Sequence, residues 1–178
     1  MDKKTIWDMN RLSVEAFRSQ PKAPLAVVVD NVRSLNNIGS IFRTSDGFAA
    51  SKVVLCGISA CPPSPEIHKT ALGAELSVEW EYFADTIDAL GALKADGWTI
   101  VCLEQVAQSV MLQDFTPDPT KRYAIVVGNE VDGVAQQVVD AADMWLEIPQ
   151  SGTKHSLNVA VSAALAMWPV YSTFLKNS

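Results

Sequence analysis

The first segment whose residue types could do chemistry is NVRSLNNIGSIFR, at residues 31–43. An apolar β-branched run precedes it and apolar residues at helical spacing follow, so it is predicted to join a strand to a helix. Asn37 is expected to cap that helix, and Gly39 with Ser40 would leave its first turn open to a ligand close to the backbone. Arg43 follows about two turns into the helix, where a guanidinium can reach anionic or oxyanionic atoms. An ordinary capped surface helix explains the same spacing.

A second segment, GNEVDG at residues 128–133, comes directly after a buried-type strand. Its two glycines are spaced as in a phosphate loop, but the Lys-Ser/Thr pair that should follow is missing, which excludes a P-loop. No GxGxxG occurs in the chain, and this weakens a dinucleotide site. The acids Glu130 and Asp132 disfavour phosphate and favour a cationic or hydroxyl-rich ligand. A tight turn before a helix is the alternative.

The third segment is IPQSGTKHSLNV, at residues 148–159, between a predicted strand and the last helix. Ser156 and Asn158 lie at a helix start beside exposed backbone amides, and Ser156 is the expected cap. The adjacent pair His155 and Ser156 does not indicate a hydrolase, because sequence neighbours rarely form a triad and no G-x-S-x-G elbow is present.

These segments need a fold in which strands alternate with helices. Strands are predicted at 25–30, 52–56, 78–83, 99–103, 123–127 and 144–148. The alternation indicates an α/β fold with a mostly parallel six-stranded sheet flanked by helices. Ligands of such sheets bind at the carboxyl ends of the strands, which points to the loops 31–37, 104–109, 128–134 and 149–156. Pro169 is expected to kink or end the last helix.

The chain of 178 residues is long enough for one domain with a sizeable core. Residues 1–22 are predicted to be an N-terminal helical extension that ends at the breaker QPKAP, and residues 23–178 the main domain. The apolar face of that extension would consist of Ile6, Met9, Leu12, Val14 and Phe17.

Charge is unevenly distributed. The chain has 14 Lys and Arg against 20 Asp and Glu, a net charge of −6, which taken alone argues against a nucleic acid partner. Residues 75–104 hold seven acids against one lysine, away from the three motif segments, whereas residues 3–74 hold nine bases against five acids. We therefore expect a dipolar protein that meets an anionic partner with its N-terminal half and binds it with steep salt dependence.

Other classes of protein do not fit the composition. The N-terminus lacks the apolar core of a signal peptide, and no apolar run reaches the ~20 residues of a membrane span, so no membrane partner is expected. Cys56, Cys61 and Cys102 lack metal-ligand spacing, so no metal site is predicted. Free thiols fit a reducing cytosol, which favours a cytoplasmic protein.

Taken together and in this order, the three segments resemble the SpoU-type (TrmH-like) RNA ribose 2′-O-methyltransferases of the SPOUT superfamily. The resemblance rests on N-x-G-S-x-x-R at 37–43, VVGNEVDGV at 126–134 and IPQSGTKHSLNVAVSAAL at 148–165. It covers essentially residues 25–168. It implies a parallel α/β sheet with a C-terminal trefoil knot, S-adenosylmethionine held in the knot largely by backbone groups, and a homodimer packed partly through the last helix.

The resemblance also assigns roles to residues. Arg43 takes the central catalytic position; because a guanidinium stays protonated, we expect it to stabilise negative charge on the 2′-oxygen or grip the adjacent phosphate. Asn37, Glu130, Ser156 and Asn158 would orient the ribose and Arg43. The implied cofactor residues are Leu103, Gly128, Asn129, Ile148, Ser156 and Leu157. Candidates for RNA phosphate contact are Arg33, Lys69, Lys154 and His155, each of which is also explained as a solvated surface charge.

The predicted function is therefore methyl transfer from S-adenosylmethionine to a ribose 2′-hydroxyl of RNA. Only about 24 residues precede the matched span, and relatives that modify transfer RNA are often this compact, so tRNA is favoured over rRNA. A non-catalytic RNA-binding or assembly factor on the same fold is one alternative. A nucleotide-binding oxidoreductase is another, against which the missing GxGxxG counts.

Overall fold

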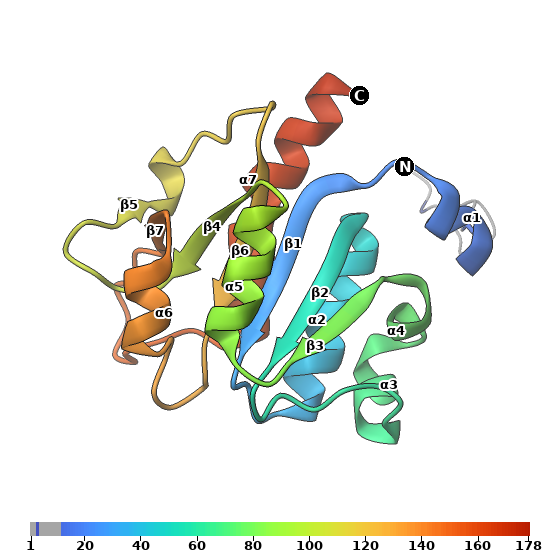
Figure 1. Cartoon of the computed structure of the whole chain (residues 1–178), viewed down its shortest axis with the longest axis horizontal. Helices are drawn as coiled ribbons and strands as arrows, with labels where there is room; N and C mark the ends of the chain where they lie inside the picture. The colour runs from blue at the N-terminus through green and yellow to red at the C-terminus, as the bar shows by residue number, and fades with distance from the viewer. Residues whose placement is uncertain (1–2, 4–11) are drawn as a thin grey trace.

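A computed structural model describes residue 3 and residues 12–178 of the chain. Strands and helices alternate along most of it (Figure 1). In chain order the elements are α1 (Val14–Ser19), β1 (Ala23–Asp30), α2 (Leu35–Gly47), β2 (Ala50–Cys56), α3 (Pro65–Ala71), α4 (Ala74–Ser77), β3 (Trp80–Phe83), α5 (Thr86–Ala95), β4 (Trp98–Leu103), β5 (Val110–Met111), η2 (Leu112–Asp114), β6 (Arg122–Val127), α6 (Gln136–Ala141), β7 (Met144–Glu147) and α7 (Val159–Asn177).

The sheet has seven strands in the order β3-β2-β1-β6-β4-β7-β5, and every recorded strand pair is parallel. The prediction of six strands was wrong by one: β5 was missed because two residues carry no periodicity, and it pairs only with β7 at the sheet edge. The order of the strands reverses between β1 and β6, which pair with each other although about half of the chain lies between them. Their carboxyl ends therefore bring the loops after residues 30 and 127 together.

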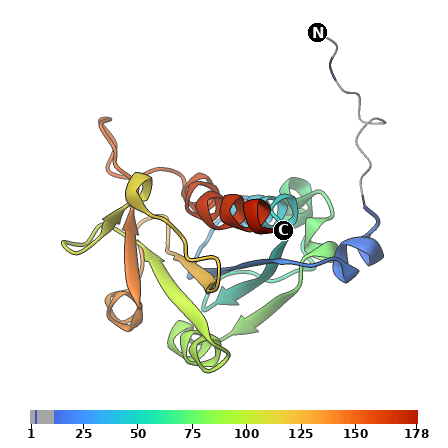
Figure 2. The same ribbon diagram turned by 90° about the horizontal axis from the view of Figure 1, so that it is seen from above.

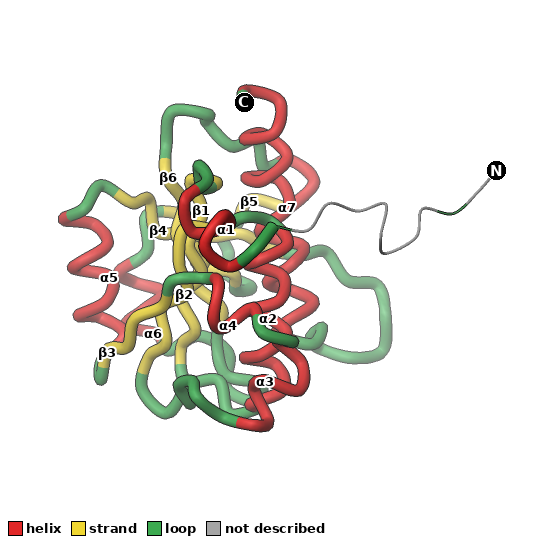
Figure 3. Tube along the Cα trace, turned by 90° about the vertical axis from the view of Figure 1, so that its right-hand side faces the viewer, coloured by secondary structure: helices red, strands yellow, loops and turns green. Residues whose placement is uncertain are grey.

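Two apolar layers cover the sheet, with α2 and α7 over one face and α5 and α6 over the other (Figures 2 and 3). The side chains of β1 show how the two apolar layers form, because successive side chains of a strand point to opposite faces of the sheet. Val27 packs in the cluster that contains Phe42 and Met167, whereas Val28 packs in the cluster that contains Leu90. The continuous β-branched run read from the sequence is thus a strand covered on both sides.

The N-terminal extension is only partly described. Helix α1 covers Val14–Ser19 and buries Phe17, while Ile6 and Met9 of the predicted apolar face lie outside the described residues. The trefoil knot that the resemblance implies concerns how the C-terminal segment threads the chain, and it stays a prediction.

Pro169 was expected to kink or end the last helix. Helix α7 passes through Pro169 and continues to Asn177, so the second of these outcomes is excluded. A proline removes the N–H that the carbonyl of Leu165 would otherwise bind, and Leu165 is 41% exposed, so this missing hydrogen bond lies on the outer side of the helix. By length and composition alone α7 passes as a membrane span, a test that core helices also pass. Its buried face, which includes Ala163 and Met167, belongs to the core.

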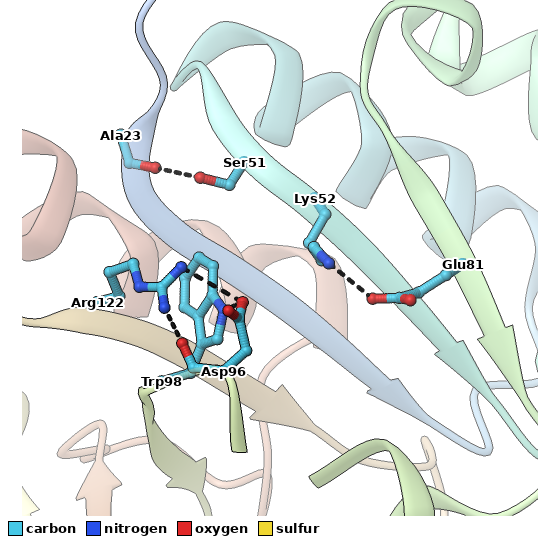
Figure 4. Close-up of polar contacts among 7 residues, drawn as sticks. All are labelled: Ala23, Ser51, Lys52, Glu81, Asp96, Trp98 and Arg122. Atoms are coloured by element: carbon cyan, nitrogen blue, oxygen red, sulfur yellow. Dashed lines mark hydrogen bonds and ion pairs between the residues drawn. The ribbon is translucent and has the colours of Figure 1, made fainter. Parts of the chain in front are cut away.

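Part of the acidic segment is neutralised within the fold (Figure 4). The Lys52 Nζ donates to Glu81 Oε1 at 2.9 Å, which joins β2 to β3. Arg122 contacts the Asp96 carboxylate at 3.3 Å and lies over the Trp98 ring, 4.8 Å from its centroid. These exposed pairs contribute little to stability, but they reduce the charge that the segment presents to a partner.

The three thiols are free, and Cys56 and Cys102 are buried. Burial raises the pKa of both thiols to about 12. Within residue 3 and residues 12–178, no group of three His, Cys, Asp or Glu side chains is arranged to hold a metal ion.

Gly39 serves helix packing, so the expectation that it leaves room for a ligand was wrong. It is buried where α2 meets α3, and a Cβ there would overlap the Thr70 hydroxyl and the Ile67 carbonyl. Gly39→Ala is expected to lower the free energy of unfolding by about 1–3 kcal/mol, measured by urea denaturation, because a backbone carbonyl has to move. Gly47→Ala is the matched control on the same helix, since a Cβ there meets nothing within 4 Å. Equal stabilities of the two variants would contradict this packing role.

Candidate functional site

A cavity of about 700 Å³ opens at the carboxyl ends of β4, β6 and β7. Its walls come from the loops that follow these strands and from the first residues of α7. The six residues implied to bind the cofactor all lie in this lining: Leu103, Gly128, Asn129, Ile148, Ser156 and Leu157. Segments far apart in the sequence therefore form one site.

The 128–134 loop folds back on itself to form one wall of the cavity. Asn129 and Gly133 exchange two backbone hydrogen bonds of 2.9 and 3.0 Å. The Asn129 side chain accepts from Val131 N–H at 2.8 Å and donates to the Asn31 carbonyl at 2.8 Å. Gly128 is required because a Cβ would overlap the Gly133 carbonyl group and the following backbone nitrogen. The Asn129 side chain thus holds the loop against the end of β1.

Glu130 reaches from this loop to the start of α2. Its Oε2 accepts from Arg33 N–H at 3.0 Å, and its Oε1 accepts from Ser34 N–H and from the Asn37 Nδ2, each at 3.0 Å. A carboxylate is favourable at a helix N-terminus because unpaired N–H groups and the helix dipole face it. Glu130 therefore fixes where α2 begins.

Asn37 and Asn158 extend this contact to α7. The Asn158 Nδ2 donates to Asn37 Oδ1 at 3.0 Å, and its Oδ1 accepts from Ala160 N–H and Val161 N–H at 3.0 and 3.3 Å. Asn158, and not Ser156 as expected, caps α7, because the helix starts at Val159. One hydrogen-bonded chain thus joins α7, α2 and the 128–134 loop.

The cap of α2 also differs from the expectation. Ser34 is the cap and accepts from Asn37 N–H at 3.3 Å, so Asn37 lies inside the first turn. Its side chain is thereby free to bind Glu130 and Asn158. Three of the five residues implied to be catalytic, Asn37, Glu130 and Asn158, are in direct contact.

Ser156 and Arg43 stand apart from this chain of contacts. Ser156 is exposed and lines the cavity. Arg43 is exposed on α2, outside the cavity lining, and makes no hydrogen bond or ion pair with the residues that the structure describes. Its guanidinium is therefore available to a ligand approaching along α2.

The four candidates for RNA contact are all exposed, and the structure spreads them over several elements. Arg33 precedes α2, Lys69 lies on α3, and Lys154 and His155 lie in the loop before α7. Only His155 lines the cavity, and its carbonyl accepts from Gln105 Nε2 at 3.2 Å.

Glu104 and Gln105 line the cavity and Asp30 binds the backbone beside it, but none of the three was named among the site residues predicted from the sequence. Glu104 accepts from Val134 N–H at 3.0 Å and lines the cavity. Asp30 is 1% exposed; its carboxylate accepts from the Thr86 hydroxyl at 2.6 Å and from Ala135 N–H at 3.2 Å. The sequence held one signal that could have found the two acids: Glu104 directly follows an apolar strand, and Asp30 ends one.

The cavity is acidic. Glu104, Glu130, Asp132 and Glu147 line it, and its lining includes no lysine or arginine among the residues described. The expectation that residues 75–104 avoid the motif segments was therefore wrong at Glu104. The lining fits a cationic ligand better than a phosphate, as the acids of the second segment predicted.

The hydrogen bonds at Glu130 make a pH-dependent contribution to stability. Burial by itself would raise its pKa, but donation from Arg33 N–H, the Asn37 amide and Ser34 N–H lowers the pKa below its ordinary value. A carboxylate with a lowered folded pKa stabilises the fold above its unfolded pKa of about 4.3, and this contribution is lost as the pH falls through the folded value.

Glu130→Gln is accordingly expected to lower the free energy of unfolding at pH 7 by about 1 kcal/mol, modest because the side chain is exposed. The difference from the wild type should shrink as the pH falls from about 5 to about 3, measured by urea denaturation at each pH. Glu79→Gln, an exposed acid with no side-chain hydrogen bond among the described residues, is the control. A difference that stays constant with pH would contradict the assigned contacts.

Comparison with known proteins identifies a family and several relatives that resemble this chain. The model of the SpoU rRNA Methylase family matches residues 24–168. The chain is 32% identical over 149 residues to the tRNA (guanosine(18)-2′-O)-methyltransferase TARBP1 of Mus musculus, covering 81% of this chain and 9% of that protein. It is 28% identical to the 23S rRNA (guanosine-2′-O-)-methyltransferase RlmB of Neisseria meningitidis serogroup B, covering 86% and 60%. The chain thus spans less than two thirds of the length of these relatives.

Solved structures share the fold. An AdoMet-bound rRNA methyltransferase from Sinorhizobium meliloti superposes with a TM-score of 0.77 at 28% identity, covering 88% of this chain and 59% of that one. A TrmH/SpoU tRNA modifying enzyme from A. aeolicus superposes with a TM-score of 0.80 at 25% identity, covering 92% and 83%.

Proposed function

The chain belongs to the SpoU rRNA methylase family, and from this premise we propose that it transfers the methyl group of S-adenosylmethionine to a ribose 2′-hydroxyl of RNA. One observation carries the proposal: the three motif segments meet beside one acidic cavity, and Asn37, Glu130 and Asn158 join them through direct hydrogen bonds. The neighbouring structure from S. meliloti, which holds AdoMet, supports the choice of cofactor.

The residues present fit S-adenosylmethionine, which supplies a methyl group on a positively charged sulfonium. Four carboxylates and no lysine or arginine line the described cavity, so its charge is complementary to that cation. Gly128, Ile148 and Leu157 would supply the backbone groups that hold it. The 128–134 loop is already fixed by its own hydrogen bonds, which reduces the free energy needed to order the site on binding.

Arg43 is the residue through which this chain would act on the RNA. Glu130 and Asn37 fix the N-terminus of α2, and Arg43 extends from the same helix with no competing contact among the described residues. Placed beside the ribose, the guanidinium would stabilise charge developing on the 2′-oxygen or hold the adjacent phosphate. Ser156, exposed at the cavity, would contact the ribose or the cofactor.

Transfer RNA is the proposed substrate, and ribosomal RNA is the second candidate. The mouse relative is named a tRNA methyltransferase, and so is a relative from Borreliella burgdorferi that is 25% identical over 98% of this chain and 78% of that protein. The Neisseria relative is named a 23S rRNA methyltransferase. Exposed Arg33, Lys69, Lys154 and His155 would contact phosphates.

The test is incubation of the purified protein with bulk tRNA and, separately, with rRNA, in the presence of S-adenosylmethionine that carries a deuterated methyl group. Nucleoside mass spectrometry is expected to find deuterated 2′-O-methylnucleosides in the tRNA sample. Labelled product only in rRNA would change the substrate. Base-methylated product would contradict 2′-O transfer, and unmodified RNA in both samples would favour the non-catalytic RNA-binding factor.

We also propose that two copies assemble through α7. Its outer face exposes apolar side chains at helical spacing, namely Val161, Leu165, Trp168 and Leu175. Leu165→Asp is expected to shift the protein from dimer to monomer, measured by sedimentation equilibrium, because it places a charge in a desolvated contact. Leu72→Asp, at an exposed leucine outside this face, is the control. A monomeric wild type would contradict the assembly.

A further inference from the structure

Two adjacent side chains after β4 tie the walls of the cavity together. Glu104 Oε2 accepts from Val134 N–H at 3.0 Å, across to the 128–134 loop. Gln105 Nε2 donates to the His155 carbonyl at 3.2 Å, across to the loop before α7. The dipeptide thus connects the loops after β4, β6 and β7, which together form most of the lining.

The Glu104 carboxylate is also held in one orientation. Its second oxygen accepts from Gln105 N–H at 2.8 Å, so each oxygen has one backbone donor. A carboxylate retains further acceptor positions and its full negative charge after two such bonds. No basic side chain among the described residues forms an ion pair with it.

The other carboxylates of the lining are placed differently. Glu130 turns towards α2, where three donors bind it. Asp132 is exposed at the tip of its loop. Glu147 lies in the lining and makes no side-chain hydrogen bond with described residues. Glu104 is the carboxylate that the fold fixes in the cavity by bonds to two of its loops.

We propose that Glu104 makes the cavity selective for the charge of its ligand, so that it prefers the sulfonium cofactor to the thioether left after methyl transfer. This inference rests on the proposed function. In that reaction the C–S bond breaks with its electron pair remaining on sulfur, an O–C bond forms at the ribose, and the hydroxyl proton is released to solvent. Sulfur thereby becomes neutral, and the attraction of a fixed carboxylate for it is lost. The product therefore binds more weakly than the cofactor and leaves readily.

Gln105 provides the contrast because it is uncharged. It positions the loop before α7 through its contact with the His155 carbonyl, so its loss changes the shape of the cavity. Shape affects cofactor and product alike, since the two differ by one methyl group and one charge. Selectivity for the charge of the ligand is therefore assigned to Glu104, whereas both residues help to set the shape of the cavity.

The experiment is calorimetric titration of S-adenosylmethionine and S-adenosylhomocysteine into the wild type, Glu104→Gln and Gln105→Ala. Glu104→Gln keeps an acceptor oxygen for Val134 N–H, the bond that joins the two loops, and loses only the bond from the adjacent Gln105 N–H. It is expected to weaken S-adenosylmethionine binding about tenfold while changing S-adenosylhomocysteine binding by less than about twofold. Gln105→Ala is expected to weaken both ligands by the same factor. Asp88→Asn, an exposed acid on α5, is the control and should change neither.

A measurement on the wild type makes the inference independent of how the variants fold. Raising the salt concentration should weaken S-adenosylmethionine more than S-adenosylhomocysteine, because only the former is held by charge. One outcome would overturn this inference alone: the wild type binds both ligands, Glu104→Gln leaves the ratio of their affinities unchanged, and salt weakens both equally. Glu104 would then not make the cavity selective for ligand charge, and the proposed function would stand. Binding of neither ligand by the wild type would overturn the proposed function and this inference with it.

Discussion

Arg43→Ala is expected to lower methyl transfer to RNA by about 100-fold or more while leaving the affinity for S-adenosylmethionine within about twofold. The asymmetry follows from where the residue lies. Arg43 is exposed on α2, outside the cavity lining, and bound to none of the described side chains, so its removal disturbs neither the cavity nor the fold. The loss should therefore fall on turnover and on RNA binding.

Single-turnover rates with saturating cofactor, together with calorimetry of cofactor binding, separate the two effects. Arg43→Lys is the matched variant, since it keeps the charge but loses the planar donors, and an intermediate rate is expected. Near-normal turnover of Arg43→Ala would remove this residue from the proposed role. Loss of cofactor binding would instead place Arg43 in the cavity.

Gly128→Ala is expected to weaken S-adenosylmethionine binding by about 10- to 100-fold, the effect of about 1–3 kcal/mol of steric strain. The added Cβ would overlap the Gly133 carbonyl group and the backbone of Val134, which cannot rotate away as a side chain can. The loop would have to open, with loss of the paired hydrogen bonds between Asn129 and Gly133. One wall of the cavity moves as a result.

Gly152→Ala is the matched control for this loop substitution. It lies in another loop at the carboxyl edge of the sheet, and a Cβ there meets nothing within 4 Å. Calorimetry of cofactor binding should therefore give wild-type affinity for Gly152→Ala. Equal affinity of both variants and the wild type would show that the cavity does not hold the cofactor.

Much of the fold was predictable because its signals are local. Continuous runs such as residues 25–30 and 123–127 are buried on both faces, and they were read as strands from the sequence alone. The cap of α5 is equally local, since the Asp85 carboxylate accepts from Ile87 N–H, two residues along the chain, at 2.8 Å. The two residues of β5 are too few to show a periodic pattern. Its partner β7 lies more than thirty residues further along the chain, so no local signal indicates the pairing.

The site was less predictable because distant partners decide it. Ser34 and Asn37 are both good cap residues, and the sequence alone does not choose between them. Glu130, 93 residues from Asn37, settles the choice by binding the Asn37 amide. Similarly, Gly39 was predicted to leave room for a ligand, but α3 occupies the space beside it.

The three motif segments were found from their residue types and spacing, and the family resemblance assigned roles to their residues. Glu104 lay in a predicted loop at the carboxyl ends of the strands but in none of the three segments. Its partner, Val134 N–H, is 30 residues away, and only the parallel arrangement of β4 and β6 brings them together. The net charge of the chain says little about the charge of the site, for a related reason. A sum over the chain does not distinguish acids paired with lysine or arginine, such as Glu81 and Asp96, from an acid inside a cavity.

The most direct test of the central claim is where the transferred methyl group resides on the RNA. RNA treated with the protein and radiolabelled S-adenosylmethionine is hydrolysed in alkali, which cleaves beside every free 2′-hydroxyl. A 2′-O-methyl group blocks that cleavage, so the label is expected in alkali-resistant dinucleotides. RNA treated with Arg43→Ala is expected to carry less of this label by about 100-fold or more. Label recovered in mononucleotides would place the methyl group on a base and contradict 2′-O transfer.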